Sequence, residues 1–159
     1  MIEVEIEEDR WLAALPDAVT LVRAAADAAL SESNGPADAE VTVLLTEDAE
    51  LKTLNAQFRG KDKPTNVLSF PAAAFAAPHL GDVALAFETC AREADEQGKP
   101  LSDHLSHLVA HGVLHLLGWD HEADAEAEAM EALERKVMAR LGVPDPYLAR
   151  GSDGELRRL

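Results

Sequence analysis

The sequence predicts an α+β fold in which a mixed four-stranded sheet packs with about five helices. Four short segments show the alternation or the valine and leucine content that is typical of strands: residues 2–7, 39–46, 67–71 and 80–87. Apolar residues make up 47% of the chain and aromatic residues 4%, with alanine and leucine prominent, which favours helices elsewhere. With 159 residues, we expect one domain over residues 1–148 and a loose tail over 149–159.

The first two predicted strands are each followed by a predicted helix. Residues 2–7, "IEVEIE", alternate at period two, and a helix is expected from near Pro16 to near Ser33. The strand 39–46 leads into the helix "EDAELKTLNAQF", whose acidic first turn suits the helix dipole. Connections of this length indicate crossovers between parallel strands.

The last two predicted strands are joined differently. The connection "AAAFAAPH" is too short for a crossover helix with its loops, so these strands are expected to be antiparallel. Three further helices are predicted, and each ends at a glycine: Gly98, Gly118 or Gly142. The middle one, "SDHLSHLVAHGVLHLL", is expected to begin at a Ser102 cap, which places most of the histidines in the C-terminal half.

The charge of the chain is strongly acidic. Fourteen Lys and Arg residues face thirty Asp and Glu residues, giving a formal net charge of −16. Such a surface repels phosphate backbones at long range, so a nucleic-acid role requires a local basic exception or a protein partner. The single cysteine, Cys90, fits a reducing compartment, and we expect a cytoplasmic protein without a signal peptide or membrane span.

Three histidines in "HGVLHLLGWDH", residues 111–121, indicate a metal site. His111 and His115 lie one helical turn apart on one face, as two ligands of one ion require. Gly118 is placed to end the helix, so that the chain can turn back and present His121 from the loop. Three imidazoles and one water form an open, catalytic type of site, for which zinc is the first expectation and nickel or another divalent ion an alternative.

Other residues near this segment have several interpretations. His107 lies one turn before His111 and is either a partner of a ligand or an ordinary helix residue; His104 projects to the same broad face. Asp120 can accept a ligand's N–H, accept a proton, or simply stabilise a turn. Gly112 occupies the position that holds the catalytic glutamate in H-E-x-x-H proteases, and it can serve substrate approach or close helix packing.

The one basic cluster of the chain lies in "NAQFRGKDKPTNVLSF". Its three basic residues are Arg59, Lys61 and Lys63, and they form the one place that would attract a phosphate. Arg59 can clamp a phosphate bidentately, whereas the two lysines are interpreted as part of a solvated loop.

Together these stretches resemble the YbeY family of bacterial endoribonucleases, which cut single-stranded RNA in ribosomal RNA maturation. Residues 111–121 match its H-G-x-L-H-x-x-G-[YW]-D-H motif, with Trp119 where tyrosine is more usual. The segment "FRGKDKPTNVLSFP", residues 58–71, is similar to the family's second block, in which Arg59 occupies the position of the proposed catalytic residue. The strand "LGDVALA" and, more weakly, the C-terminal "LGVPDPY" are also similar.

The resemblance implies a metal held by His111, His115 and His121, and Arg59 as a catalytic residue. The chemistry of such a site favours metal-bound water as the nucleophile, with Arg59 stabilising the phosphoryl transition state. The resemblance also implies action on the 3′ end of 16S ribosomal RNA, a part in ribosome quality control, and partners that include ribosomal proteins and the GTPase Era. The missing glutamate speaks against a protease, since a phosphodiester depends more on charge neutralisation. Two alternatives stay open: a metallopeptidase or other metal hydrolase, and a ribosome-assembly factor with a structural metal.

Overall fold

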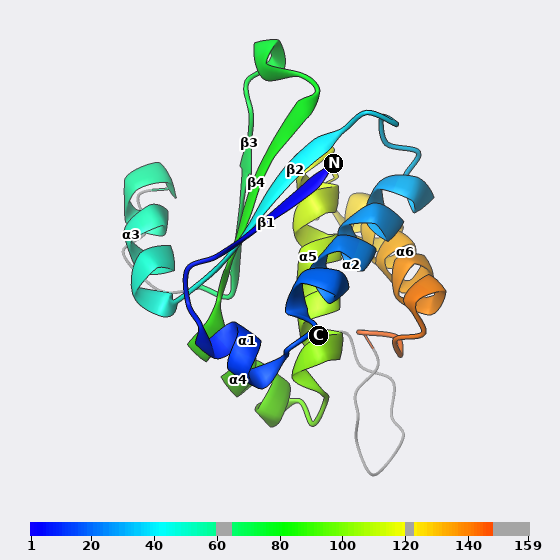
Figure 1. Ribbon diagram of the computed structural model, residues 1–159. Helices are drawn as coiled ribbons and strands as arrows, with labels where there is room; N and C mark the ends of the chain where they lie inside the picture. The colour runs from blue at the N-terminus through cyan, green and yellow to red at the C-terminus, as the bar shows by residue number, and fades with distance from the viewer. Residues whose placement is uncertain (60–64, 120–122, 148–159) are drawn as a thin grey trace.

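A computed structural model describes residues 1–59, 65–119 and 123–147, which form a four-stranded sheet and six α-helices (Figure 1). The strands are β1 (Ile2–Ile6), β2 (Glu40–Thr46), β3 (Val67–Pro71) and β4 (His79–Ala86). The helices are α1 (Arg10–Ala14), α2 (Ala18–Glu32), α3 (Asp48–Arg59), α4 (Phe87–Glu96), α5 (Leu101–Leu116) and α6 (Asp124–Leu141). The predicted α+β class is confirmed.

The sheet is mixed, with the strand order β1-β2-β4-β3. β1 pairs with β2 and β2 with β4 in parallel, whereas β3 pairs with β4 in antiparallel. Two of these pairings are the ones expected from the connection lengths: β1 with β2 across α2, and β3 with β4, which only a short 3-10 turn, Ala74–Ala76, joins. The parallel crossover expected from β2 to β3 through α3 is wrong, because β4 lies between these two strands and pairs in parallel with β2 but in antiparallel with β3.

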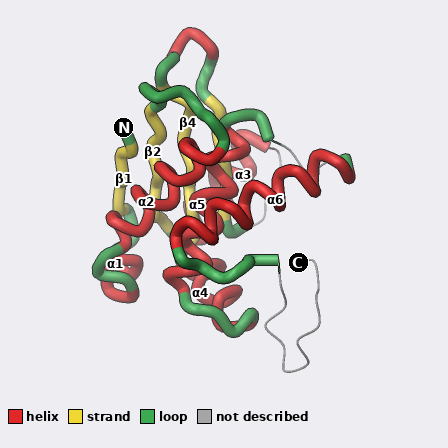
Figure 2. Tube along the Cα trace, turned by 90° about the vertical axis from the view of Figure 1, so that its right-hand side faces the viewer, coloured by secondary structure: helices red, strands yellow, loops and turns green. Residues whose placement is uncertain are grey.

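Helices cover the two faces of the sheet unequally. α2, α5 and α6 lie together on one face, and α3 lies on the other (Figures 1 and 2). Residues Val43, Leu45, Val83 and Leu85 are fully buried in the main core under the three helices. A smaller cluster, which contains Leu51, lies under α3. Within the described segments, each helix is too short or too polar to traverse a lipid bilayer.

Two features of the helices differ from the sequence prediction. A separate short helix, α1, precedes Pro16, and its Trp11 is fully buried with its indole N–H donating to the Thr46 carbonyl at 2.9 Å. α5 begins at Leu101 rather than after a Ser102 cap; Pro100 takes the N-cap position without a side-chain hydrogen bond. Burial of Trp11 stabilises the additional helix α1, which local propensity alone did not indicate. At α5, the fixed φ of Pro100 outweighs the capping preference of Ser102.

α5 packs tightly on β3 and β4 through Gly112. A Cβ atom at Gly112 would lie 2.6 Å from Val83 Cγ1 and 3.2 Å from Ser69 Oγ. The Ser69 hydroxyl donates to the Gly112 carbonyl at 3.0 Å, so helix and strand are joined by a buried hydrogen bond as well. Close helix packing is therefore the role of this glycine.

Gly112→Ala is expected to lower the free energy of unfolding by about 1–3 kcal/mol, because an added methyl overpacks the contact between α5 and β4. Urea unfolding measures the change. Val83→Ala removes the atom nearest to the new methyl, so the double variant should recover part of the loss. Strictly additive losses in the two variants would contradict this account.

Candidate functional site

His111 and His115 face each other on the last turns of α5. Their Nε2 atoms lie 3.0 Å apart and their ring centroids 4.5 Å apart. This confirms that the i, i+4 spacing brings the two rings together. Both residues are only partly buried.

α5 ends as the glycine predicts. Gly118 has φ +96°, its N–H donates to the His115 carbonyl at 3.0 Å, and the Trp119 N–H donates to the Leu114 carbonyl at 3.0 Å. This pair of bonds is the Schellman motif, which terminates a helix and turns the chain. His121 and Asp120 lie outside the described residues, so the third predicted ligand stays a prediction.

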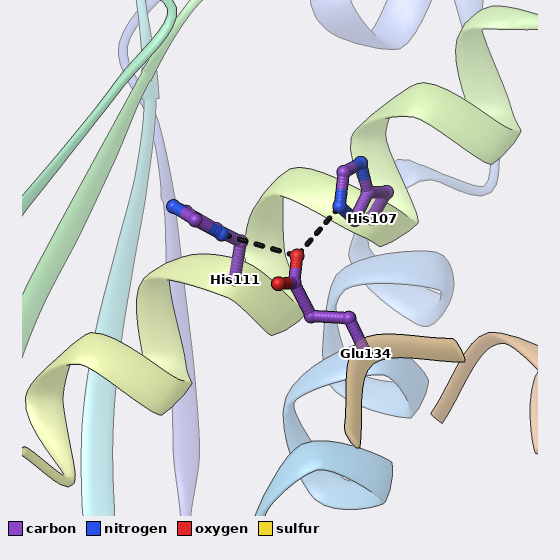
Figure 3. A group of neighbouring side chains, drawn as sticks. All are labelled: His107, His111 and Glu134. Carbon is purple, nitrogen blue, oxygen red and sulfur yellow. Dashed lines mark hydrogen bonds and ion pairs between the residues drawn. The ribbon is translucent and has the colours of Figure 1, made fainter. Parts of the chain in front are cut away.

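A buried glutamate joins the histidines from a neighbouring helix (Figure 3). Glu134 of α6 is 1% exposed, and its Oε1 lies 2.7 Å from His107 Nε2 and 3.1 Å from His111 Nδ1. Glu134 is not among the site residues predicted from the sequence, because α6 contains several glutamates. A signal was available, because Glu134 shares the buried face of that helix with Met130, Val137 and Met138.

The protonation states in this cluster follow from burial and hydrogen bonding. Burial alone raises the pKa of Glu134, but hydrogen bonds from His107 and His111 more than offset it and lower that pKa to about 2. Burial lowers the pKa of His107 despite the neighbouring carboxylate, so a neutral His107 faces an ionised Glu134. Within the described part of the chain, the buried His107 Nδ1 has no hydrogen-bond partner, which fits a neutral ring protonated at Nε2.

The donor atoms fit a metal ion in two ways. Imidazole nitrogens bind zinc at about 2.0–2.1 Å, so the His111 and His115 Nε2 atoms, 3.0 Å apart, can share one ion. The second arrangement uses His107, His111 and Glu134, whose ligand atoms all lie within 4.8 Å of one another. The geometry identifies these donor sets but not the metal.

The other histidines have separate partners. His104 is buried and its Nε2 lies 2.9 Å from Oε1 of Glu93 on α4, an oxygen that also accepts a hydrogen bond from the Asn66 amide at 2.9 Å. Hydrogen bonds from His104 and Asn66 lower the pKa of Glu93 against the opposing effect of burial. His104 therefore turns towards α4 rather than joining His111, and His79 pairs with Asp82 at the surface.

Part of the second block, residues 58–71, contacts α5, the helix that carries His111 and His115. Arg59 is the last residue of α3, but its side chain, like Lys61 and Lys63, lies outside the described part of the chain. β3, which ends that block, lies against α5 through the bond from Ser69 to Gly112. A cavity of about 220 Å³ lies at the start of β3, and His107, His111 and Asn66 contribute to its wall.

Comparison with known proteins identifies the family. The family model described as "Endoribonuclease YbeY" matches residues 3–142. A protein named Endoribonuclease YbeY from Rhodopseudomonas palustris strain BisB18 is 56% identical over 152 residues, which cover 91% of this chain and 90% of that protein. One of the same name from Jannaschia sp. strain CCS1 is 51% identical, over 92% of this chain and 99% of that protein.

Solved structures agree with this result. The solution structure of TM1509 from Thermotoga maritima is 27% identical to this chain, with a TM-score of 0.57, and the match covers 89% of this chain and 92% of that one. The family match spans both blocks that carry the resemblance, including the described histidines and the strand that packs against them. This chain belongs to the YbeY family.

Proposed function

We propose that this protein is a single-strand-specific, metal-dependent endoribonuclease whose ion is held by His111, His115 and His121. The observation that carries the proposal is the pair of His111 and His115 Nε2 atoms, 3.0 Å apart on α5, in a chain that matches the endoribonuclease family over residues 3–142. A zinc ion is the first candidate, with nickel as the alternative. The catalytic unit is one domain over residues 1–148.

Each residue has a distinct part in the proposed reaction. An ion held by His111, His115 and His121 would supply the Lewis acidity that activates water for attack on a phosphodiester. Arg59 binds the phosphoryl group bidentately and stabilises the charge that develops on its oxygens. β3, which follows Arg59 in the same sequence block, is an edge strand of the sheet and lies against α5, so we propose that the guanidinium reaches the substrate around this edge.

The packing of Gly112 supports a nuclease over a protease. In H-E-x-x-H proteases the residue after the first ligand is the glutamate that acts as general base. Here that position faces β4, where even a Cβ atom would lie 2.6 Å from Val83 Cγ1. The helix face that would carry the base is therefore occupied by the sheet.

The biological setting that we propose rests on the resemblance to the family. We propose that the RNA is the 3′ end of 16S ribosomal RNA, and that the enzyme acts in the cytoplasm in ribosome quality control. A net charge of −16 disfavours unassisted binding to a long RNA, which supports delivery by ribosomal proteins and the GTPase Era.

Removal of the metal is expected to abolish cleavage of single-stranded RNA. Protein treated with a chelator should leave the RNA intact, and added zinc should restore cleavage, because the water loses its activating ion and regains it. A fluorescently labelled single-stranded RNA measures the activity, with the same sequence in a duplex as the test of strand specificity.

The same preparation distinguishes the alternatives. Incubation with casein tests the metallopeptidase; chelator-sensitive casein cleavage with intact RNA would overturn the proposal. A ribosome-assembly factor with a structural metal would cut neither substrate and would lose thermal stability when the metal is removed. Cleavage of RNA that survives complete metal removal would refute the metal dependence.

A further inference from the structure

Glu134 is a charged group in a place where a hydrophobic side chain would pack at lower cost. It is 1% exposed, and on α6 its neighbours on the same face are Met130, Val137 and Met138. A buried carboxylate is expensive to desolvate, and replacement of buried charges by apolar groups is often neutral or stabilising. A role other than stability is therefore needed to explain why a charged residue occupies this position.

The contacts of Glu134 select one nitrogen of His111. An ionised carboxylate only accepts hydrogen bonds, so Glu134 Oε1, 3.1 Å from His111 Nδ1, requires the proton of a neutral ring to be on Nδ1. The lone pair is then on Nε2, which is the atom that faces His115 Nε2 at 3.0 Å. The hydrogen bond between the Glu134 carboxylate and Nδ1 thus leaves Nε2, on the other side of the ring, as the nitrogen that can bind a metal.

His107 completes this arrangement from one turn earlier on α5. Its Nε2 lies 2.7 Å from the same Oε1 of Glu134, and it is the shorter of the two contacts. A second N–H fixes the direction of the carboxylate and compensates part of its desolvation. His107 therefore holds Glu134, and Glu134 holds His111.

We propose that Glu134 is a positioning residue, which fixes His111 in the Nδ1–H tautomer and orientation so that the lone pair of Nε2 can bind the metal. The inference rests on the proposed function, since it takes His111 Nε2 as a ligand atom. Carboxylate partners of ligating histidines typically change metal affinity by about 10–100-fold when they are removed. His107, on this account, is not a metal ligand.

The competing arrangement makes Glu134 and His107 ligands themselves. Their donor atoms and those of His111 lie within 4.8 Å of one another. That site would use His111 Nδ1 as the ligand atom. The facing Nε2 atoms of His111 and His115 would then not bind the ion. The two arrangements predict different effects of replacing His107, so a binding measurement separates them.

The test measures zinc affinity by competition with a chromogenic chelator. Glu134→Met keeps the volume but removes the acceptor, and it is expected to weaken zinc binding about 10–100-fold. Glu134→Gln keeps an acceptor oxygen and should fall between this variant and the wild type. Glu128→Gln removes the same charge from an exposed position of α6 and should bind zinc as the wild type does. His107→Gln should lose less affinity than His111→Ala.

A second readout reports the tautomer directly. Nitrogen-15 spectra of the metal-free protein should place the His111 proton on Nδ1, and Glu134→Met should shift population to Nε2–H. A purely structural role of Glu134 would change the melting temperature but not this ratio.

The outcomes are distinguishable. Wild-type zinc affinity in both Glu134 variants, with His115→Ala still losing the metal, would overturn only this inference. A loss in His107→Gln as large as that in His111→Ala would favour the direct site and overturn it as well. If Glu134→Met does not fold, Glu134→Gln and His107→Gln decide the question. Failure of the proposed function would appear separately, as RNA cleavage that survives complete metal removal.

Discussion

His115→Ala is expected to lose both the metal and the cleavage of RNA. The side chain supplies one of two Nε2 atoms that lie 3.0 Å apart, and a single remaining imidazole from α5 cannot hold the ion in place. Loss of an outer partner already costs about 10–100-fold in affinity, so loss of a ligand should cost more than about 100-fold. Metal analysis of the purified protein and the labelled-RNA assay measure the two losses.

The control for this variant is His79→Ala. His79 lies on β4 and pairs with Asp82 at the surface, so its removal takes away an imidazole without touching the α5 site. It should keep full metal content and cleavage. An His115→Ala protein that cuts RNA at the wild-type rate, even with its metal content reduced, would show that the ion is structural and that the nuclease mechanism is wrong.

Arg59→Ala is expected to reduce cleavage by about 10²–10³-fold while the metal content stays unchanged, because one preorganised transition-state contact is typically worth that much. Arg59 contributes no ligand to the proposed ion, so binding and catalysis should separate. Arg59→Lys should restore part of the rate, since it returns the charge but not the planar pair of donors.

Arg92→Ala provides the matched loss of charge. Arg92 is an exposed residue of α4 whose partner is Glu96, one turn later on the same helix. Its replacement should leave the cleavage rate unchanged. Loss of metal in Arg59→Ala would assign Arg59 a structural role, and an unchanged rate would remove it from the reaction.

Local patterns in the sequence were sufficient for most elements of the fold. β1 follows from alternation in residues 2–6, and the pairings of β1 with β2 and of β3 with β4 follow from connection lengths. The facing of His111 and His115 follows from helical geometry, and the end of α5 follows from the conformational freedom of Gly118. These features depend on residues within a few positions of one another, so the order of residues encodes them directly.

Contacts between distant segments could not be read in the same way. Glu134 lies 27 positions from His107 and 23 from His111, and only the packing of α6 against α5 selects it from the other glutamates of its helix. The contact of Gly112 with Val83 likewise depends on how closely α5 approaches β4.

The sequence by itself therefore determined most elements, the pairings of β1 with β2 and of β3 with β4, and the two facing histidines, because short-range geometry and periodicity govern these. The tertiary structure alone decided which carboxylate lies behind His111 and which surface of α5 is closed by the sheet. The physical reason is that packing chooses one partner among several that are chemically equivalent along the chain.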